Sequence, residues 1–271
     1  MPGRGGRGGS NNRDPLPRSV QVSKKLSRLL RHAAEEEGIH LDAAGYANVH
    51  EVLTNRLLRS FKVTFPELRD LVLNNDKQRF ALKPAFSSSP AENEDDKLSD
   101  DPKDWLIRAN QGHSLKIESE GLLTPVSVDD RPETAVHGTT HAAWPMIVAS
   151  GGLKPMARNH VHFASGLPAG FTSIGDGDGG DPAAAPPVIS GMRKSSTVLM
   201  FLDVGMAISS GLKLWRSANG VILTEGDAEG VVPLEMFKRV EDRTGQGVLL
   251  EDGKIVKEAP ASWATKGKGK G

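Results

Sequence analysis

A serine-rich, acidic stretch divides this 271-residue chain into two patterned parts. It runs from Phe86 to Lys103 and reads FSSSPAENEDDKLSDDPK, which is too polar and charged to form a core. Before it, apolar residues recur with the period of a helix, and after it short apolar runs typical of strands dominate. We therefore expect residues 85–103 to be a linker or surface insertion between two lobes, in a chain long enough to bury a sizeable core.

The first lobe, residues 19–84, is predicted to contain three short helices followed by a strand. The first helix covers VSKKLSRLLRHAAEEE, with Ser23 as a plausible N-cap and Gly38 at its end. The second covers NVHEVLTNRLLRS, and the third, PELRDLVLN, has a proline in its first turn. With the strand RFALKP, this order favours a winged-helix-like lobe. The Gly- and Arg-rich residues 1–18 are expected to be a disordered basic arm.

The second lobe, residues 104–245, is predicted to be a mixed, α+β lobe rich in short strands. Candidate strands are NHVHFAS and TVLMFLDV, and a helical stretch, HAAWPMIVASGG, follows TAVHGTT. Asn219-Gly220 between LKLWRSA and VILTE favours a tight hairpin. Residues 167–190 are Gly/Pro-rich and are expected to be a loop insertion, and residues 246–271 a flexible basic tail.

Composition excludes several classes of protein. The absence of cysteine excludes disulfides, thiolate metal sites and thiol nucleophiles. No apolar run approaches the roughly 20 residues that span a bilayer, and no apolar segment near the start resembles a secretory signal. We expect an intracellular protein of the cytoplasm, the nucleus or both. The basic arm and the KGKGKG end can bind a polyanion or serve only as solubilising tails, and both readings stay open.

A glycine motif in the loop insertion has the residue pattern of a dinucleotide-binding site but lacks the helix that such a site requires after it. Gly175, Gly177 and Gly180 satisfy G-x-G-x-x-G. DPAAAPP follows, where a dinucleotide site needs a helix that meets the pyrophosphate. We therefore interpret this segment as a loop.

Four histidines raise the question of a zinc site. His137 and His141 are four residues apart, and His160 and His162 form H-x-H. The residue after His137 is Gly138 rather than the glutamate of a metalloprotease, and Gly-Thr marks a strand end or turn. We expect no metal; activity lost with a chelator and restored by Zn²⁺ would contradict this.

Five motifs, in order, resemble those of the tRNA 2′-phosphotransferase family: LSRLLRHAAEEEG, KQRFAL, IRANQGHS, VHGTTHAAWPMIVASGGLKPMARNHVHFA and LKLWRSANGVILT. The resemblance runs from about Leu26 to about Val240 and leaves out the acidic stretch and the loop insertion. It implies an enzyme that transfers the internal 2′-phosphate of spliced tRNA to NAD⁺. The products are 2′-OH RNA, nicotinamide and ADP-ribose 1″,2″-cyclic phosphate. It also implies a second lobe like the ADP-ribosyltransferase fold, and we expect a monomer.

The resemblance implies that Arg31, His32, Arg79 and Arg216 form the catalytic set. A phosphomonoester carries roughly −1.5 to −2 charge near neutrality, and guanidinium groups present planar forks to its oxygens. We expect the three arginines to orient and neutralise the phosphate, and His32 to donate a hydrogen bond or transfer a proton. Adjacent α-helical residues point about 100° apart, so Arg31 and His32 can flank one phosphate only from a helix edge at a cleft. Taken alone, Arg31 is better explained as a surface partner of Glu35, and Arg79 as a solvated charge at a strand edge. The five-motif resemblance favours the catalytic interpretation.

For NAD⁺, the resemblance implies that His137, Gly138 and Thr139 clamp the nicotinamide ribose. The histidine binds a ribose hydroxyl, and the glycine backbone pairs with the carboxamide where a Cβ would block approach. Where protein-modifying relatives carry a catalytic glutamate, this chain has Val221 and no acid until Glu225. A nucleophile that is already an anion needs no such base.

Further residues are implied along the cofactor. The segment that walls NAD⁺ is Arg158, Asn159, His160 and Val161, with Arg158 suited to the pyrophosphate. His162 is expected to be structural. Ser114 is a weaker cofactor candidate. The other polar residues of IRANQGHS can contact RNA or NAD⁺ and stay unplaced.

Two alternatives remain open at this point. An ADP-ribosyltransferase would stop after the first step and leave a stable adduct on a nucleic-acid phosphate or a protein. A winged-helix RNA-binding module with an inert second lobe would bind RNA in a salt-sensitive way and release no nicotinamide.

Overall fold

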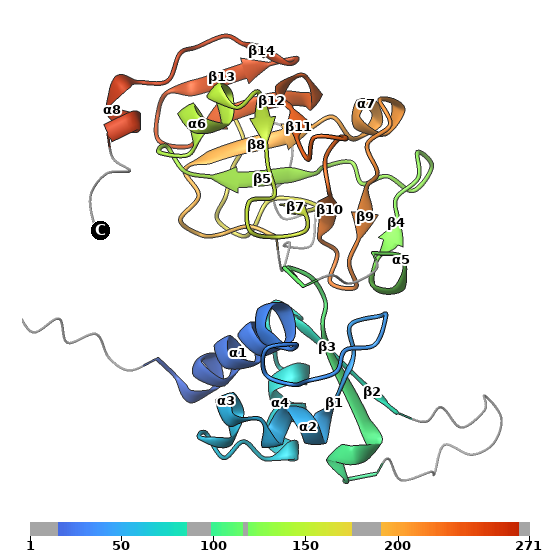
Figure 1. Ribbon diagram of the computed structural model, residues 1–271. Helices are drawn as coiled ribbons and strands as arrows, with labels where there is room; N and C mark the ends of the chain where they lie inside the picture. Colours follow the sequence, from blue (N-terminus) through green and yellow to red (C-terminus); the bar gives the residue numbers. More distant parts are fainter. Residues whose placement is uncertain (1–15, 86–98, 116–118, 175–190, 266–271) are drawn as a thin grey trace, which may run out of the picture.

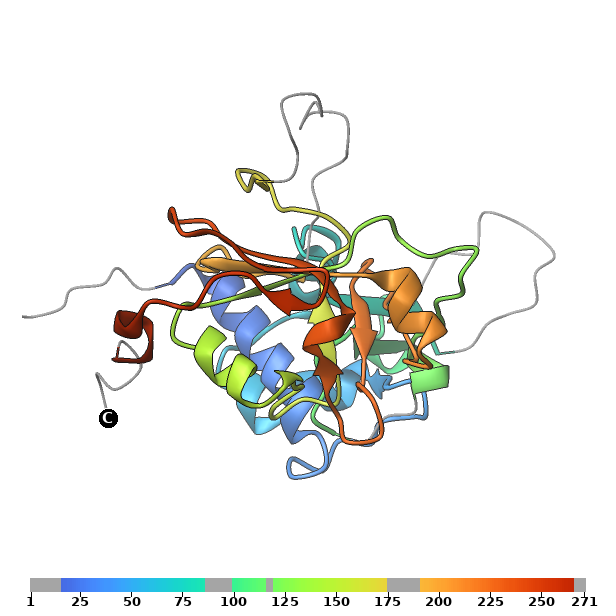
Figure 2. The same ribbon diagram turned by 90° about the horizontal axis from the view of Figure 1, so that it is seen from above.

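The computed structural model describes residues 16–85, 99–115, 119–174 and 191–265, and shows in them an α+β protein with two large hydrophobic cores and two smaller apolar clusters. The two lobes are stacked, as seen from the side in Figure 1 and from above in Figure 2. None of the helices in these ranges is both long and apolar enough to cross a membrane. The glycine motif of the loop insertion lies outside the described residues.

The first lobe packs short helices against a three-stranded antiparallel sheet of order β1-β3-β2. Leu26, Leu30 and Leu68 are fully buried between helices and sheet, as the helix-period pattern predicts. The elements are α1 (Arg18–Arg28), the π-helix η1 (Leu29–Ala33), β1 (Ala47–Asn48), α2 (Val49–Thr54), α3 (Arg56–Arg59), α4 (Phe65–Leu73), β2 (Phe80–Pro84), η2 (Pro102–Asp104) and β3 (Trp105–Ala109).

The third helix and the strand agree closely with prediction, whereas the first helix begins earlier than expected. Thr64 caps α4 and a proline stands in its first turn. Ser23 is not a cap: α1 begins at Arg18, and Ser23 is buried inside it. Arg18 makes a 2.7 Å ion pair with Glu67, a contact between distant segments that the local sequence does not reveal.

Two further boundaries differ from prediction. The second predicted helix is divided into α2 and α3 because Asn55 is extended and caps the next turn with its side chain. The cores separate at residues 110–115 rather than at the acidic stretch. The strand after that stretch, β3, pairs with β2, and its Ile107 is buried in the first core.

The second lobe wraps two main antiparallel sheets around its core. One sheet has the order β14-β13-β12-β8-β5, the other β4-β9-β10-β7, and a β11-β6 pair stands beside them. Trp144, Phe163 and Phe237 are fully buried between them. The strands are β4 (Thr124–Pro125), β5 (Val136–Thr139), β6 (Gly152–Leu153), β7 (Val161–Phe163), β8 (Val198–Leu202), β9 (Trp215–Arg216), β10 (Ile222–Thr224), β11 (Val232–Pro233), β12 (Phe237–Asp242), β13 (Gly247–Glu251) and β14 (Lys254–Ile255).

Helices are few and short in this lobe, and the predicted hairpin is present. The β9 and β10 strands pair antiparallel, and Gly220 between them has a φ of +78°, which glycine adopts without strain. The helices are α5 (Ser119–Leu122), α6 (Trp144–Ala149), α7 (Val204–Ser209), the 3₁₀ turn η3 (Leu234–Met236) and α8 (Ala261–Thr265).

The prediction of a flexible tail over residues 246–271 is wrong for its described part. Residues 247–255 form β13 and β14, which extend the five-stranded sheet, and α8 follows. Leu249 and Leu250 are fully buried, and Trp263 packs into the same core. The basic composition of the last residues hid this short apolar pattern.

Candidate active site

The segment of residues 110–115 joins the lobes and is hydrogen-bonded to both. On one side, the backbone N–H of Ser114 donates to the carbonyl of Arg31 at 3.0 Å. On the other, the backbone N–H of Asn159, just before β7, donates to the carbonyl of His113 at 3.0 Å. Residues from both lobes are therefore held against one connector.

Arg31 and His32 both lie in the π-helix that continues α1. Bonds from residue i to i+5 put more residues in each turn, so neighbours diverge by less than the roughly 100° of an α-helix. His32 Nδ1 lies 2.9 Å from Ser114 Oγ. Burial lowers the pKa of His32, and the charges of Arg31 and Arg158 lower it further, so the ring is neutral at pH 7. Single-turn π segments occur frequently at functional sites.

The Arg31 guanidinium is enclosed, and no ion pair joins it to a carboxylate of the described residues. Its Nε and Nη2 atoms are buried and have no hydrogen-bond partner in the part of the chain that the structure describes. Burial, followed by repulsion from Arg158 and Arg79, lowers its pKa to about 10, and it stays charged at pH 7. Gly112, with a φ of +87°, lets the connector pass beside it: a Cβ there would lie 3.4 Å from Arg31 Nη1. A buried donor set with no acceptor is the arrangement that an anionic ligand completes.

Arg79 lies immediately before β2 and is half-buried. Its Nη1 donates to Asn75 Oδ1 at 3.1 Å, and its carbonyl accepts from the Asn110 N–H at 2.9 Å. Burial lowers the pKa of Arg79, although the nearby Asp76 carboxylate raises it. Arg79 and Arg31 are close enough for their charges to repel.

A third arginine near this pair is Arg158. Arg158 precedes β7, and its charge lowers the pKa of both Arg31 and His32. Arg216, in β9, is held by Asp130, with Nη1 at 3.3 Å from the carboxylate and Nη2 at 2.6 Å from the backbone carbonyl. The sequence grouped Arg216 with Arg31, whereas the structure brings Arg158 to it.

His137, in β5, has a fixed tautomer. Its Nδ1 lies 2.8 Å from the His162 carbonyl, which can only accept, so Nδ1 carries the proton. Burial lowers the pKa of His137, while that hydrogen bond raises it and Arg193 and Arg158 lower it. The neutral ring therefore presents Nε2 as an acceptor, suited to a ribose hydroxyl.

The residues after His137 are packed within the protein. A Cβ on Gly138 would clash with the side chains of Met192 and Ser196, so this glycine is required by close packing. Thr139 is buried and pairs with Val198 in the sheet. Val161 is also buried in the second core, so a bound cofactor would meet it through the backbone.

His160 and His162 alternate along β7 and its approach. His160 Nε2 lies 3.5 Å from Glu225 Oε1, because Thr224 of β10 pairs with Val161. Burial lowers the pKa of His160, although Glu225 raises it. His162 is buried, donates from Nδ1 to the His160 carbonyl at 2.9 Å, and has a pKa lowered to about 3 by burial and the charge of Arg158. Glu225, absent from the expected NAD⁺ set, thus lies beside one of its members.

His113 is the residue that sequence reasoning left unplaced although it lies at the junction. It is buried, and burial, with repulsion from Arg31 and His32, lowers its pKa to about 3. Its Nε2 has no partner among the described residues. It lines a small cavity at the junction together with Gln111, Gly112, Leu122, Leu123, Asn159, His160 and Leu223. The signal in the sequence that could have identified His113 is the run of polar residues directly after the strand β3.

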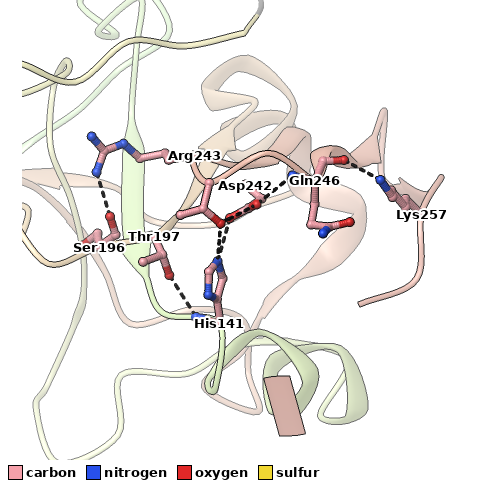
Figure 3. A network of polar contacts seen from close by, with 8 residues as sticks. His141, Ser196, Thr197, Asp242, Arg243, Gln246 and Lys257 are labelled. Carbon is pink, nitrogen blue, oxygen red and sulfur yellow. Dashed lines mark hydrogen bonds and ion pairs between the residues drawn. The ribbon is translucent and has the colours of Figure 1, made fainter. Parts of the chain in front are cut away.

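His141 is engaged elsewhere and does not join His137 at a metal. Its Nε2 lies 2.6 Å from the buried Asp242 carboxylate (Figure 3). Its ring stacks on Trp263, with ring centroids 4.0 Å apart. Thr197 Oγ1 accepts from its backbone N–H. Within the described ranges, no three His, Asp or Glu side chains are arranged to hold a metal ion.

Comparisons with known proteins agree with one another. Residues 17–226 match the family described as RNA 2′-phosphotransferase, Tpt1 / KptA family. The chain is 40% identical to tRNA 2′-phosphotransferase 1 of Danio rerio over 238 residues, which are 87% of this chain and 91% of that protein. Identity is 36% to tRNA 2′-phosphotransferase 1 of Homo sapiens (85% and 80% covered). It is 34% to tRNA 2′-phosphotransferase of Saccharomyces cerevisiae (82% and 84% covered).

Proposed function

The chain belongs to the RNA 2′-phosphotransferase family, and on that premise we propose that the junction between its lobes transfers the 2′-phosphate of spliced tRNA to NAD⁺. The enzyme removes the 2′-phosphate from RNA, as the names of its relatives state. We infer that NAD⁺ is the acceptor of this phosphate and that the residues at the junction bind both substrates.

The observation that carries the proposal is the group of mutually repelling arginines at the junction. Arg31, Arg79 and Arg158 come from three separate segments, and the charges of Arg79 and Arg158 both lower the pKa of Arg31. Bringing like charges together is unfavourable unless an anion binds among them. We assign these three arginines to the 2′-phosphate, with Arg158 in the role that the family resemblance implies for Arg216.

In the first step, a 2′-phosphate oxygen attacks C1″ of the nicotinamide ribose. The C1″–N bond breaks, its electron pair leaves with nicotinamide, and the phosphate becomes a diester between RNA and ADP-ribose. His137 orients the ribose: its Nδ1–H is engaged by the His162 carbonyl, so Nε2 accepts from a ribose hydroxyl. No base is needed, since the nucleophile is already an anion.

In the second step, the ribose 2″-hydroxyl attacks phosphorus and expels the RNA 2′-oxygen. The products are ADP-ribose 1″,2″-cyclic phosphate and RNA with a 2′-hydroxyl, which takes up the proton that the 2″-hydroxyl loses. His32 is neutral at pH 7 and can carry this proton. When Ser114 donates to His32 Nδ1, the ring proton is on Nε2 and can bond a phosphate oxygen.

The fold of each lobe is consistent with the proposed roles in binding RNA and NAD⁺. The helices and three-stranded sheet of the first lobe support a winged-helix-like description, and the two antiparallel sheets of the second an ADP-ribosyltransferase-like one. Both names are part of the proposal. Neither lobe needs a G-x-G-x-x-G site, because the cofactor is proposed to lie along β5 and β7.

The test is incubation of the full-length protein with an oligonucleotide that bears one internal 2′-monophosphate, with and without NAD⁺. We expect nicotinamide and ADP-ribose 1″,2″-cyclic phosphate only when NAD⁺ is present, detected by mass spectrometry. A stable ADP-ribosylated RNA as the end product would instead identify an enzyme that stops after the first step. Loss of phosphate without NAD⁺ would reject the proposal.

A further inference from the structure

One face of β2 packs in the first core, and the other faces outward. Side chains alternate between the two faces of a strand, and Phe80 and Leu82 pack in the core. Lys83 therefore lies on the outward face, where it is exposed. Arg79, four residues before Lys83, falls on the same face. Successive strand residues are about 3.3 Å apart, so about 13 Å of strand separates these two positions.

The neighbouring strand β3 adds a second cation to this outward face. Arg108 of β3 pairs with Ala81, the residue midway between Arg79 and Lys83. Its neighbour Ile107 is buried in the first core, so Arg108 lies on the opposite face. In Figure 1, β2 and β3 extend from the side of the first lobe that faces the second lobe. A row of cations thus begins at the arginine of the phosphate site and continues along the sheet.

The ring of Tyr46 holds these two further cations over the sheet. Tyr46 directly precedes β1, whose Ala47 pairs with Ile107, so the tyrosine comes level with Arg108. The centroid of its ring lies 4.7 Å from Arg108 Cζ and 4.1 Å from Lys83 Nζ. Cation–π contacts fix side chains that otherwise move freely, and this reduces the entropy lost when a ligand binds.

Both cations keep hydrogen-bond donors for a ligand. Arg108 Nη1 donates to the Ala44 carbonyl at 3.2 Å, and Arg108 Nε has no acceptor among the described residues. The Lys83 ammonium carries three donors and is exposed. Asp42, the acid of the turn before Tyr46, accepts from the Tyr46 backbone N–H at 2.8 Å. A guanidinium fork and an ammonium group side by side are suited to phosphate oxygens.

We propose that Lys83 and Arg108, positioned by Tyr46, bind the phosphodiesters of the RNA strand next to the 2′-phosphorylated nucleotide. A polyanionic strand is the ligand complementary to a row of cations, and the family to which the chain belongs acts on RNA. That the row extends the 2′-phosphate site rests on the proposed function, which assigns Arg79 to that phosphate. The phosphodiesters do not react, so the row lowers KM for RNA and leaves kcat unchanged.

The experiment compares the full-length protein with Lys83→Gln, Arg108→Gln and the double variant. Lys24→Gln on α1 and Lys238→Gln on β12, both exposed residues, are matched controls, one per lobe. Two substrates carry one 2′-phosphate each: a single strand of about twelve nucleotides, and a dinucleotide with a single phosphodiester.

On the longer RNA, we expect KM to rise about threefold in Lys83→Gln and about tenfold in the double variant, with kcat unchanged. We also expect the slope of log KM against log salt to fall by about 0.7 for each lost contact. On the dinucleotide, the effect of Lys83→Gln should nearly vanish, because the strand ends before it reaches this residue.

Variants that behave like the controls overturn the proposal, and so does a fall in kcat at unchanged KM. If the row instead binds the acidic residues 92–96 of this chain, the variants will leave KM unchanged or lower it, which also overturns the proposal. Thermal unfolding checks the fold of each variant. If Arg108→Gln does not fold, Lys83→Gln decides alone, because its side chain is exposed.

Binding of the same strand without a 2′-phosphate, followed by fluorescence anisotropy, separates this inference from the proposed function. If no phosphate transfer is ever observed but binding is salt-sensitive and weakened in Lys83→Gln, the row binds RNA and the proposed function fails. If transfer occurs and binding is the same in all variants, this inference alone fails.

Discussion

Buried charged groups lie close to like charges at the lobe junction, whereas they are paired with opposite charges at the outer edge of the second lobe, by which we mean His141, Asp242, Arg239 and Glu241. At the junction, Arg31 is enclosed with other cations, and two of its nitrogens have no hydrogen-bond partner among the residues that the structure describes. At the outer edge, His141 binds the buried Asp242 carboxylate at 2.6 Å, and Arg239 lies 3.1 Å from Glu241 (Figure 3 shows the first of these). Both regions are polar and partly buried, yet only the second is internally neutralised.

The difference indicates which region stabilises the fold and which binds ligand. Paired groups retain their hydrogen bonds in the free protein and oppose unfolding. Unpaired, like-charged groups raise the free energy of the free protein, and an anion that binds among them recovers that energy. Substitutions in the two regions should therefore separate activity from stability.

The largest expected effect is on activity at the junction. Arg158→Lys and Arg31→Lys should each lower kcat/KM about 10²–10³-fold, because an ammonium group lacks the planar fork that holds two phosphate oxygens. Thermal unfolding should be unchanged or slightly improved. Turnover near that of the unaltered enzyme in both variants would contradict the assignment.

A large effect on stability is expected at the outer edge. Asp242 accepts hydrogen bonds from His141, Thr244 and the Gln246 backbone. Asp242→Ala should lower the free energy of unfolding by about 3 kcal/mol, from urea titrations with an unchanged m-value. The kcat per folded molecule should stay within about twofold of the unaltered enzyme, because no junction residue is changed. If kcat per folded molecule instead fell strongly along with stability, the proposed difference between the two regions would be contradicted.

Acid should weaken the junction through His113. Its pKa is about 3 in the folded protein against an ordinary 6.5, so below pH 6.5 the unfolded chain binds a proton that the folded chain does not. Its contribution to stability is complete above pH 6.5 and is lost as the pH falls toward 3, by at most about 1.4 kcal/mol per pH unit. Between pH 6.5 and 5, the free energy of unfolding, measured by urea unfolding, should therefore fall less steeply in His113→Gln than in the unaltered protein. The difference in slope should be at most about 1.4 kcal/mol per pH unit. An unaltered pH dependence would show that His113 is not buried as a neutral group.

The smallest effect is expected at Arg216, whose partner Asp130 is about half exposed. Arg216→Gln should lower kcat/KM less than tenfold and change stability by at most about 1 kcal/mol. The same assays with Arg158→Gln as the matched variant decide between the two arginines. A loss at residue 216 equal to that at residue 158 would restore the set expected from sequence.

Local pattern predicted elements well where the pattern itself decides them. The apolar period and the proline gave α4, the apolar runs gave β2, β7 and β8, and Asn219-Gly220 gave the hairpin. The local pattern failed where a distant segment determines the structure. The start of α1 is one case, because Arg18 pairs with Glu67 there. The strand β13 is the other, because it pairs with β12.

The site divides in the same way. The motifs alone identify residue types, and their resemblance to the family singles out Arg31, His32, Arg79 and His137. Which cations share a space depends instead on how distant segments pack, and this packing brings Arg158 to Arg31 and binds Arg216 to Asp130. The apolar period of a segment shows which of its faces is buried, and this can be read from the segment alone. Which side chains from distant segments meet at the junction depends on how the two separately packed cores lie against each other.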